Sequence, residues 1–96
     1  MLLEDRFGEF LENCRGQSKH SRRNYQQRLK CFLQTHGAKT AADIKPADIN
    51  AWHRELQSRR LAPATLAGYR QALKAFFNYC VEEGDILKSP AAHLTI

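Results

Sequence analysis

The stretch TLAGYRQALKAFFNYCVEEG, residues 65–84, has the pattern of one long amphipathic helix. Pro63 suits the first turn of such a helix, because its missing N–H would have no partner there. Gly84 suits the position just past the end, where the chain turns left-handed. Arg70 and Lys74 share a second face of the helix. The larger apolar side chains recur at spacings of three and four residues and share the first face, which predicts a core helix: Leu66, Tyr69, Leu73, Phe76, Phe77 and Cys80.

The length of 96 residues predicts one domain with one hydrophobic core and leaves little room for a large enzyme pocket. Hydrophobic residues make up 43% of the chain, which favours a folded protein over a disordered one. No apolar run approaches the roughly 20 residues that a membrane-spanning helix needs. Met1-Leu2-Leu3 is followed at once by Glu4 and Asp5, unlike a signal peptide, so a cytoplasmic location is expected.

The three cysteines, Cys14, Cys31 and Cys80, lie far apart in the sequence. An odd number of cysteines without an export signal predicts reduced thiols. A zinc site would need closely paired ligands, whereas the nearest combination, Cys31 with His36, stands alone. The sequence therefore predicts neither a metal site nor a cofactor.

The net charge of +5, from 15 basic and 10 acidic residues, is only a weak indication of a nucleic-acid partner. The distribution of the charges is more informative. Four of the ten acidic residues lie in the first twelve positions, which predicts an acidic first helix. Residues 15–30 hold six basic residues and no acid, and residues 56–81 hold four basic residues and no acid. The positive charge is therefore concentrated in two blocks.

Other segments also carry the apolar spacing of helices. Ser18 is a good N-cap, Pro46 suits a first turn, and Trp52 is expected to anchor the core. His53 is more simply a structural histidine than a ligand. Helices are expected over residues 3–14, 18–36, 46–60 and 63–84, with a short last turn or helix over residues 91–94 and a basic turn at residues 59–63.

The helix expected over residues 18–36 carries basic side chains along one side. With Tyr25 placed at 0°, its apolar face lies within about 80° of Tyr25. Arg28 points elsewhere, at about 300°. Between about 60° and 160° lies what we call the basic strip: Lys19, Arg22, Arg23, Gln26 and Lys30.

A shift of 44 residues aligns this helix with the helix of the opening stretch. The aligned pairs include Tyr25 with Tyr69, Leu29 with Leu73, Lys30 with Lys74, and Phe32 with Phe76. Any two amphipathic helices share apolar spacing, but these also share tyrosine and lysine positions. The repeat predicts two similar helices that could address one extended, pseudo-symmetric target, and a DNA groove is such a target.

A basic strip by itself can equally be a solvated helix face. Here no interleaved acids neutralise the basic strip or the second face of the other helix, with Arg70 and Lys74. Both surfaces lie near helix N-termini, where free N–H groups can take a phosphate. Gln26 with Arg22 or Arg23 could reach base edges, whereas the lysines suit phosphates. The candidate DNA-binding residues are Ser18, Lys19, Ser21, Arg22, Arg23, Gln26, Lys30, Arg59, Arg60, Thr65, Arg70 and Lys74.

No hydrolase or transferase site can be assembled from the chain, because it has no Gly-rich phosphate loop and no Gly-x-Ser-x-Gly turn. We therefore expect no catalytic residues. Besides a DNA-binding domain, the composition allows a second class of function, a helical protein–protein interaction module whose basic face meets an acidic partner.

The pattern Ser18…Ser21…Tyr25…Leu29…Phe32, followed by Pro63-Ala64-Thr65…Tyr69…Leu73 and Gly84-x-Ile86-x-x-Ser89-Pro90-Ala91, resembles a known family. It is similar to the N-terminal core-binding domain of tyrosine recombinases, the phage-integrase-like site-specific recombinases. The resemblance covers about residues 3–94. Its sharpest part is the Gly-x-Ile-x-x-Ser-Pro-Ala ending.

The resemblance implies an all-α fold, an orthogonal bundle of four to five helices with SAM-like topology over residues 1–96, with a linker starting at 95–96. It implies half of a clamp around double-stranded DNA, with the second and fourth helices facing the DNA. The first helix would contact other recombinase subunits in a tetramer. The domain would thus support DNA integration and recombination, with no membrane and no cofactor involved.

The resemblance also implies that catalysis belongs to a C-terminal domain missing here, so that this chain alone would not be an enzyme. The family's His-x-x-Arg box and nucleophilic tyrosine lie in that domain. The match at His20 to Arg23 is then chance, and Tyr25 and Tyr69 lie on apolar faces. One departure is Ala62, where a capping Ser or Thr is expected, at a cost of about 1 kcal/mol in helix stability.

Overall fold

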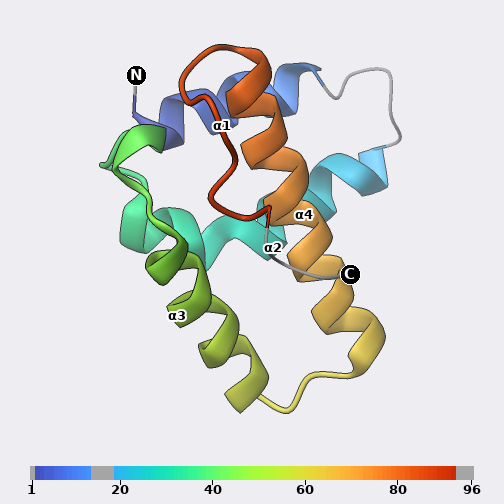
Figure 1. The fold of residues 1–96 in the computed structure, drawn as a ribbon. Coiled ribbons are helices and arrows are strands. Elements are labelled where there is room, and N and C mark those ends of the chain that lie inside the picture. Colours follow the sequence, from blue (N-terminus) through green and yellow to red (C-terminus); the bar gives the residue numbers. More distant parts are fainter. Residues whose placement is uncertain (1, 14–18, 93–96) are drawn as a thin grey trace.

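The computed structural model describes residues 2–13 and 19–92, and these residues form an all-α bundle (Figure 1). In Figure 1, α4 crosses α2 steeply, and both pack against α1. The prediction of an orthogonal bundle of four to five helices is confirmed. Its elements are α1 (Leu3–Asn13), α2 (Lys19–His36), the short 3-10 helix η2 (Ala41–Asp43), α3 (Pro46–Ser58) and α4 (Pro63–Glu82).

The apolar face predicted for α4 is the centre of the core. Leu73, Phe76, Phe77 and Cys80 are completely buried, and Leu66 and Tyr69 pack against them while partly exposed. The aligned residues on α2, Leu29 and Phe32, are buried to the same degree. The 44-residue repeat therefore marks two helices that supply equivalent side chains to one core.

Aromatic rings join the four helices to one another. Phe76 of α4 meets Phe7 edge-on, with ring centroids 5.4 Å apart, and it also contacts Phe10 of α1. On the other side of the core, Phe32 of α2 packs edge-on against Trp52 of α3. Trp52 is buried, so its predicted role as a core anchor is confirmed. Such edge-to-face pairs add to the stabilisation that burial of the rings provides.

The ends of α4 agree with the sequence pattern. Ala62 occupies the N-cap position without a side-chain hydrogen bond, and Pro63 begins the helix. At the other end, Gly84 adopts a φ of 83°, a conformation that costs glycine little because it has no Cβ. The N–H of Asp85 then donates to the carbonyl of Cys80, which closes the last turn. The structure therefore agrees with the sequence that α4 has no side-chain cap at Ala62.

Helix α3 ends earlier than predicted. The expected end was near Arg60, but the helix stops at Ser58 and Arg59 caps it. Arg60 has a φ of 54°, which reverses the chain toward α4. A non-glycine residue in this left-handed region is uncommon, so periodicity could not have located the end.

The segment between α2 and α3 and the start of α3 hold two local caps. Thr40 donates to the Asp43 carboxylate (2.9 Å), and the N–H of Lys45 donates to the Asp48 carboxylate (3.0 Å). At the C-terminal end, the Ser89 hydroxyl accepts from the N–H of Ala91 (3.2 Å) within a turn at residues 90–92. The helix expected over residues 91–94 falls partly outside the described residues.

An ion pair ties α1 to the end of α4. Arg6 donates from Nε and Nη2 to the two carboxylate oxygens of Asp85, at 2.6 and 2.8 Å. Hydrogen bonding to Asp85 raises the pKa of Arg6 above its usual range. This two-pronged contact fixes the position of α1, whose Glu4 and Asp5 are exposed.

Candidate nucleic-acid interface

Three residues of the basic strip lie exposed on α2: Arg23, Gln26 and Lys30. Lys19, Ser21 and Arg22 belong to the first turns of the same helix, but their side chains are outside the described part of the structure. Ser18, the predicted N-cap, also lies outside the described residues.

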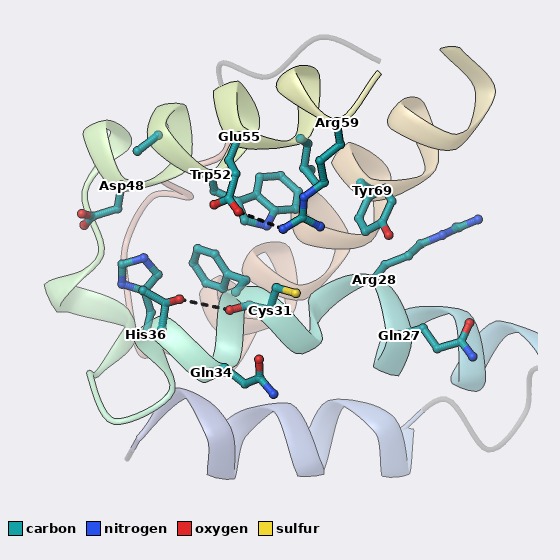
Figure 2. A pocket seen from close by; sticks show the side chains of 14 residues that line it. Gln27, Arg28, Cys31, Gln34, His36, Asp48, Trp52, Glu55, Arg59 and Tyr69 are labelled. Carbon is teal, nitrogen blue, oxygen red and sulfur yellow. Dashed lines mark hydrogen bonds and ion pairs between the residues drawn. The ribbon is translucent and has the colours of Figure 1, made fainter. Parts of the chain in front are cut away.

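Gln26 and Lys30 border a hollow between α1 and α2. Its other walls include Phe7, Leu33 and the acidic residue Glu4. Figure 2 shows α2 running between α1 and α3, with α1 on the side away from α3. This part of the basic strip therefore lies beside α1.

The basic residues predicted on α4 are less exposed than those on α2. Arg70 and Lys74 are both partly buried, whereas Thr65, in the first turn of α4, is exposed. Nη1 of Arg70 lies 3.2 Å from Nε2 of His53 on α3. A guanidinium can only donate, so Nε2 accepts and the ring proton is on Nδ1. Arg70 thus links α4 to α3, and His53 has the structural role expected of it.

The basic turn before α4 holds Arg59 and Arg60, both exposed. Nη2 of Arg59 donates to the Glu55 carboxylate at 2.8 Å. This contact and the neighbouring Cys31 raise the pKa of Arg59. The charge of Arg59 is therefore partly balanced by Glu55 of α3, although residues 56–81 themselves contain no acid.

A groove runs between α2 and α3, with α4 at one end (Figure 2). Cys31, Trp52 and the Glu55–Arg59 pair line its middle, as Figure 2 shows. Tyr69 and Arg28 lie together at the α4 end, and His36 and Asp48 lie at the opposite end. The groove has no signal in the sequence, because it is formed only when α2 and α3 pack.

Arg28 is the residue that sequence reasoning left out of the interface. Its helical angle separates it from the basic strip, and in the structure its guanidinium lies over Gly68 of α4. The signal that could have found it is Gly68 itself. A glycine inside a strong helical pattern usually has a packing reason, and here that reason is Arg28.

The thiols that the structure describes are free, and they differ in environment. Cys80 is buried in the core, and desolvation raises its pKa to about 12. Cys31 is exposed at the groove. Within the described residues, no three side chains of metal-ligating type come together. Nor does any helix among them combine the length and apolarity needed to cross a membrane.

The family model for "Phage integrase, N-terminal SAM-like domain" matches residues 5–84. The match includes all of α2, α3 and α4. The chain belongs to this family. The resemblance to the tyrosine recombinase family drawn from the sequence is thereby confirmed, and the bundle described above is a SAM-like domain of the phage-integrase type.

The curated relatives that this chain resembles are named tyrosine recombinase XerC. Tyrosine recombinase XerC of Vibrio campbellii is 30% identical over 91 residues, which cover 91% of this chain and 29% of the relative. Tyrosine recombinase XerC of Vibrio atlanticus is 31% identical over 93 residues, covering 90% of this chain and 29% of the relative. The chain thus spans about 29% of the length of these relatives. A comparison with solved structures gave no significant match.

His36 gives this domain an expected pH dependence. Its ring packs on Phe32, and burial together with the nearby charge of Lys39 lowers its pKa below the ordinary 6.5, against a smaller opposite effect of Asp48. The unfolded chain therefore binds the proton more readily than the folded one, so stability falls as the pH drops below about 6.5. The fall levels off below the lowered pKa of the folded state.

Urea unfolding of the wild type and His36→Gln between pH 5 and 8 measures this contribution. We expect the wild type to lose more stability on acidification than His36→Gln does. Equal pH profiles for the two proteins would show that His36 titrates alike in the folded and unfolded states.

Proposed function

We propose that these 96 residues are the DNA-binding part of a site-specific recombinase that serves DNA integration and recombination. The domain would form one half of a clamp on double-stranded DNA, while catalytic groups outside these residues carry out strand exchange. The observation that carries the proposal is the basic strip, exposed on α2 at Arg23, Gln26 and Lys30 in a member of this family. The proposal implies a cytoplasmic location, because a recombinase must be in the compartment that contains the DNA.

The chemistry of the basic strip, together with Lys74 and Thr65 on α4, suits a duplex. Lysine is a compact charge that holds a phosphate in many orientations, whereas arginine and glutamine offer paired groups that match base edges. Lys30 and Lys74 are thus assigned to phosphates, and Arg23 and Gln26 to positions from which bases come within reach. Thr65, in the first turn of α4, adds a hydroxyl beside free backbone N–H groups.

The proposal also assigns a role to α1. Glu4 and Asp5 are exposed on this helix, and their charge would repel the DNA backbone. We propose that α1 instead contacts a neighbouring recombinase subunit when several copies assemble on DNA.

The salt dependence of duplex binding tests the proposal. If five to six phosphates are neutralised, the logarithm of the association constant falls against the logarithm of salt concentration with a slope of about −5. Fluorescence anisotropy of a labelled duplex of mixed sequence, between 50 and 250 mM salt, measures this slope.

A slope near zero, or no duplex binding at the lowest salt, would contradict the proposal. In that case, a stable complex with an acidic protein would favour the interaction module that the composition also allows. A single-stranded oligonucleotide of equal charge serves as the control, since a clamp for duplex DNA should bind it more weakly.

A further inference from the structure

Arg28 occupies an unusual position between the two helices of the repeat. It projects from α2 toward α4, at the α4 end of the groove in Figure 2, and is partly buried there. Its guanidinium lies directly over Gly68. A Cβ atom built on Gly68 would be 2.8 Å from Cζ of Arg28 and 2.9 Å from each terminal nitrogen.

These distances are shorter than a real Cβ contact allows, so the guanidinium occupies the space that any other side chain at position 68 would need. The absence of a Cβ at position 68 therefore leaves the space that the guanidinium occupies. Arginine has many rotamers, and contact with the flat backbone surface at Gly68 restricts them before any ligand binds.

On its α4 side Arg28 has uncharged neighbours, whereas on its α3 side it lines the groove that also holds Glu55 and Arg59. It borders a hollow of about 170 Å³ between α2 and α4, whose other lining residues are Asn24, Tyr25, Gly68, Gln71 and Ala72. No acid lines this hollow, whereas Glu4 lines the hollow beside Lys30 and Glu55 lines the groove beside Arg59. Arginine, asparagine and glutamine are the side chains that read base edges in the major groove.

Three other arginines of the bundle are engaged within the protein, whereas Arg23, Arg54 and Arg60 are exposed. Arg6 binds Asp85, Arg59 binds Glu55, and Arg70 contacts His53. Among the described residues, no hydrogen bond or ion pair engages Arg28. Its donors are thus available in a fixed place, between the two helices that supply the proposed DNA surface.

We propose that Arg28 is a specificity-determining residue that reads a guanine in the major groove, and that Gly68 is its positioning residue. This inference rests on the proposed function. Arginine donates to O6 and N7 of guanine with two parallel N–H groups, which requires an oriented guanidinium. Asn24 and Gln71 flank it and would contact neighbouring positions.

Selection from a randomised duplex pool by the 96-residue wild type, followed by sequencing, tests the assignment. We expect a guanine preference at one position, and a loss of this preference by about tenfold or more in Arg28→Gln and in Gly68→Ala. Gly68→Ala leaves every charge in place, so its affinity for an unselected duplex should stay within about twofold. Arg54→Gln, on the exposed face of α3, is the matched control for the lost charge and should keep the preference.

Gly68→Ala also separates misfolding of the domain from displacement of the Arg28 guanidinium. Alanine favours a helix interior, and the group that its Cβ would meet is the flexible end of the Arg28 side chain. Its melting temperature should not fall.

If Arg28→Gln weakens binding to all duplexes alike and keeps the guanine preference, Arg28 contacts phosphate and the proposal is overturned. If both variants select the wild-type sequences, the proposal is overturned while DNA binding stands. Failure of the wild type to bind any duplex would overturn the proposed function itself.

Discussion

Simultaneous reversal of Arg23, Lys30 and Lys74 to glutamate is expected to abolish retention of duplex DNA. Each change removes a positive charge and adds a negative one, which repels the phosphate that the wild-type residue would bind. If each residue neutralises one phosphate, the three account for more than half of the salt slope of about −5. The loss of affinity at 100 mM salt should then be on the order of a thousandfold or more. Fluorescence anisotropy with the labelled duplex measures it.

The control must match the change in net charge, which falls from +5 to −1 in this variant. Reversal of Lys39, Arg54 and Lys88, all exposed and none in the predicted interface, makes the same change. We expect this control to bind the duplex far more tightly than the first variant. Equal losses would mean that overall charge, and not the basic strip, determines binding. Unchanged binding by the first variant would contradict the assignment of the strip.

Replacement of Phe76 by alanine is expected to cause a loss of stability of about 3–5 kcal/mol. Phe76 is fully buried and contacts Phe7 and Phe10 of α1 and Phe77 on its own helix. Its removal leaves a cavity at the meeting point of α1 and α4. Domains of this size have a total stability of roughly 5–15 kcal/mol, so the variant should be close to unfolding at 25 °C. Urea unfolding followed by circular dichroism measures the difference.

Two variants on the same helix set the scale for this loss. Asn78→Ala, at an exposed position, should change stability by less than about 0.5 kcal/mol. Phe76→Leu keeps most of the apolar volume and should lie between Asn78→Ala and Phe76→Ala. A loss below about 1 kcal/mol for Phe76→Ala would contradict the packing of α1 against α4 described here.

The fold was largely predictable because its periodic signals are strong and local. The spacing of Leu73, Phe76 and Phe77 identified the buried face of α4, and the conformation of Gly84 agrees with the predicted helix end. The early end of α3 was not predictable. It depends on Arg60 adopting a left-handed backbone conformation, and arginine does not indicate such a conformation in a sequence. The ion pair between Arg6 and Asp85 was equally hidden, since it joins residues 79 positions apart.

The candidate site was predictable only in part, and the reason is physical. A helical wheel gives the angle of a side chain about its own axis, but not which helix covers that angle. Arg70 and Arg59 were assigned to an open surface, yet one contacts His53 and the other Glu55. Arg28 was set aside at about 300° on the wheel, although that angle faces Gly68 of α4.

The sequence by itself thus determined the helices, the buried faces, the concentration of charge and the family. These properties depend on the residue types within one chain segment and on their spacing, and both can be read directly from the sequence. The tertiary structure decided which basic side chains are paired, which are exposed, and where α2 meets α4. Those properties depend on the crossing of helices, and a single missing Cβ at Gly68 determines what lies between them.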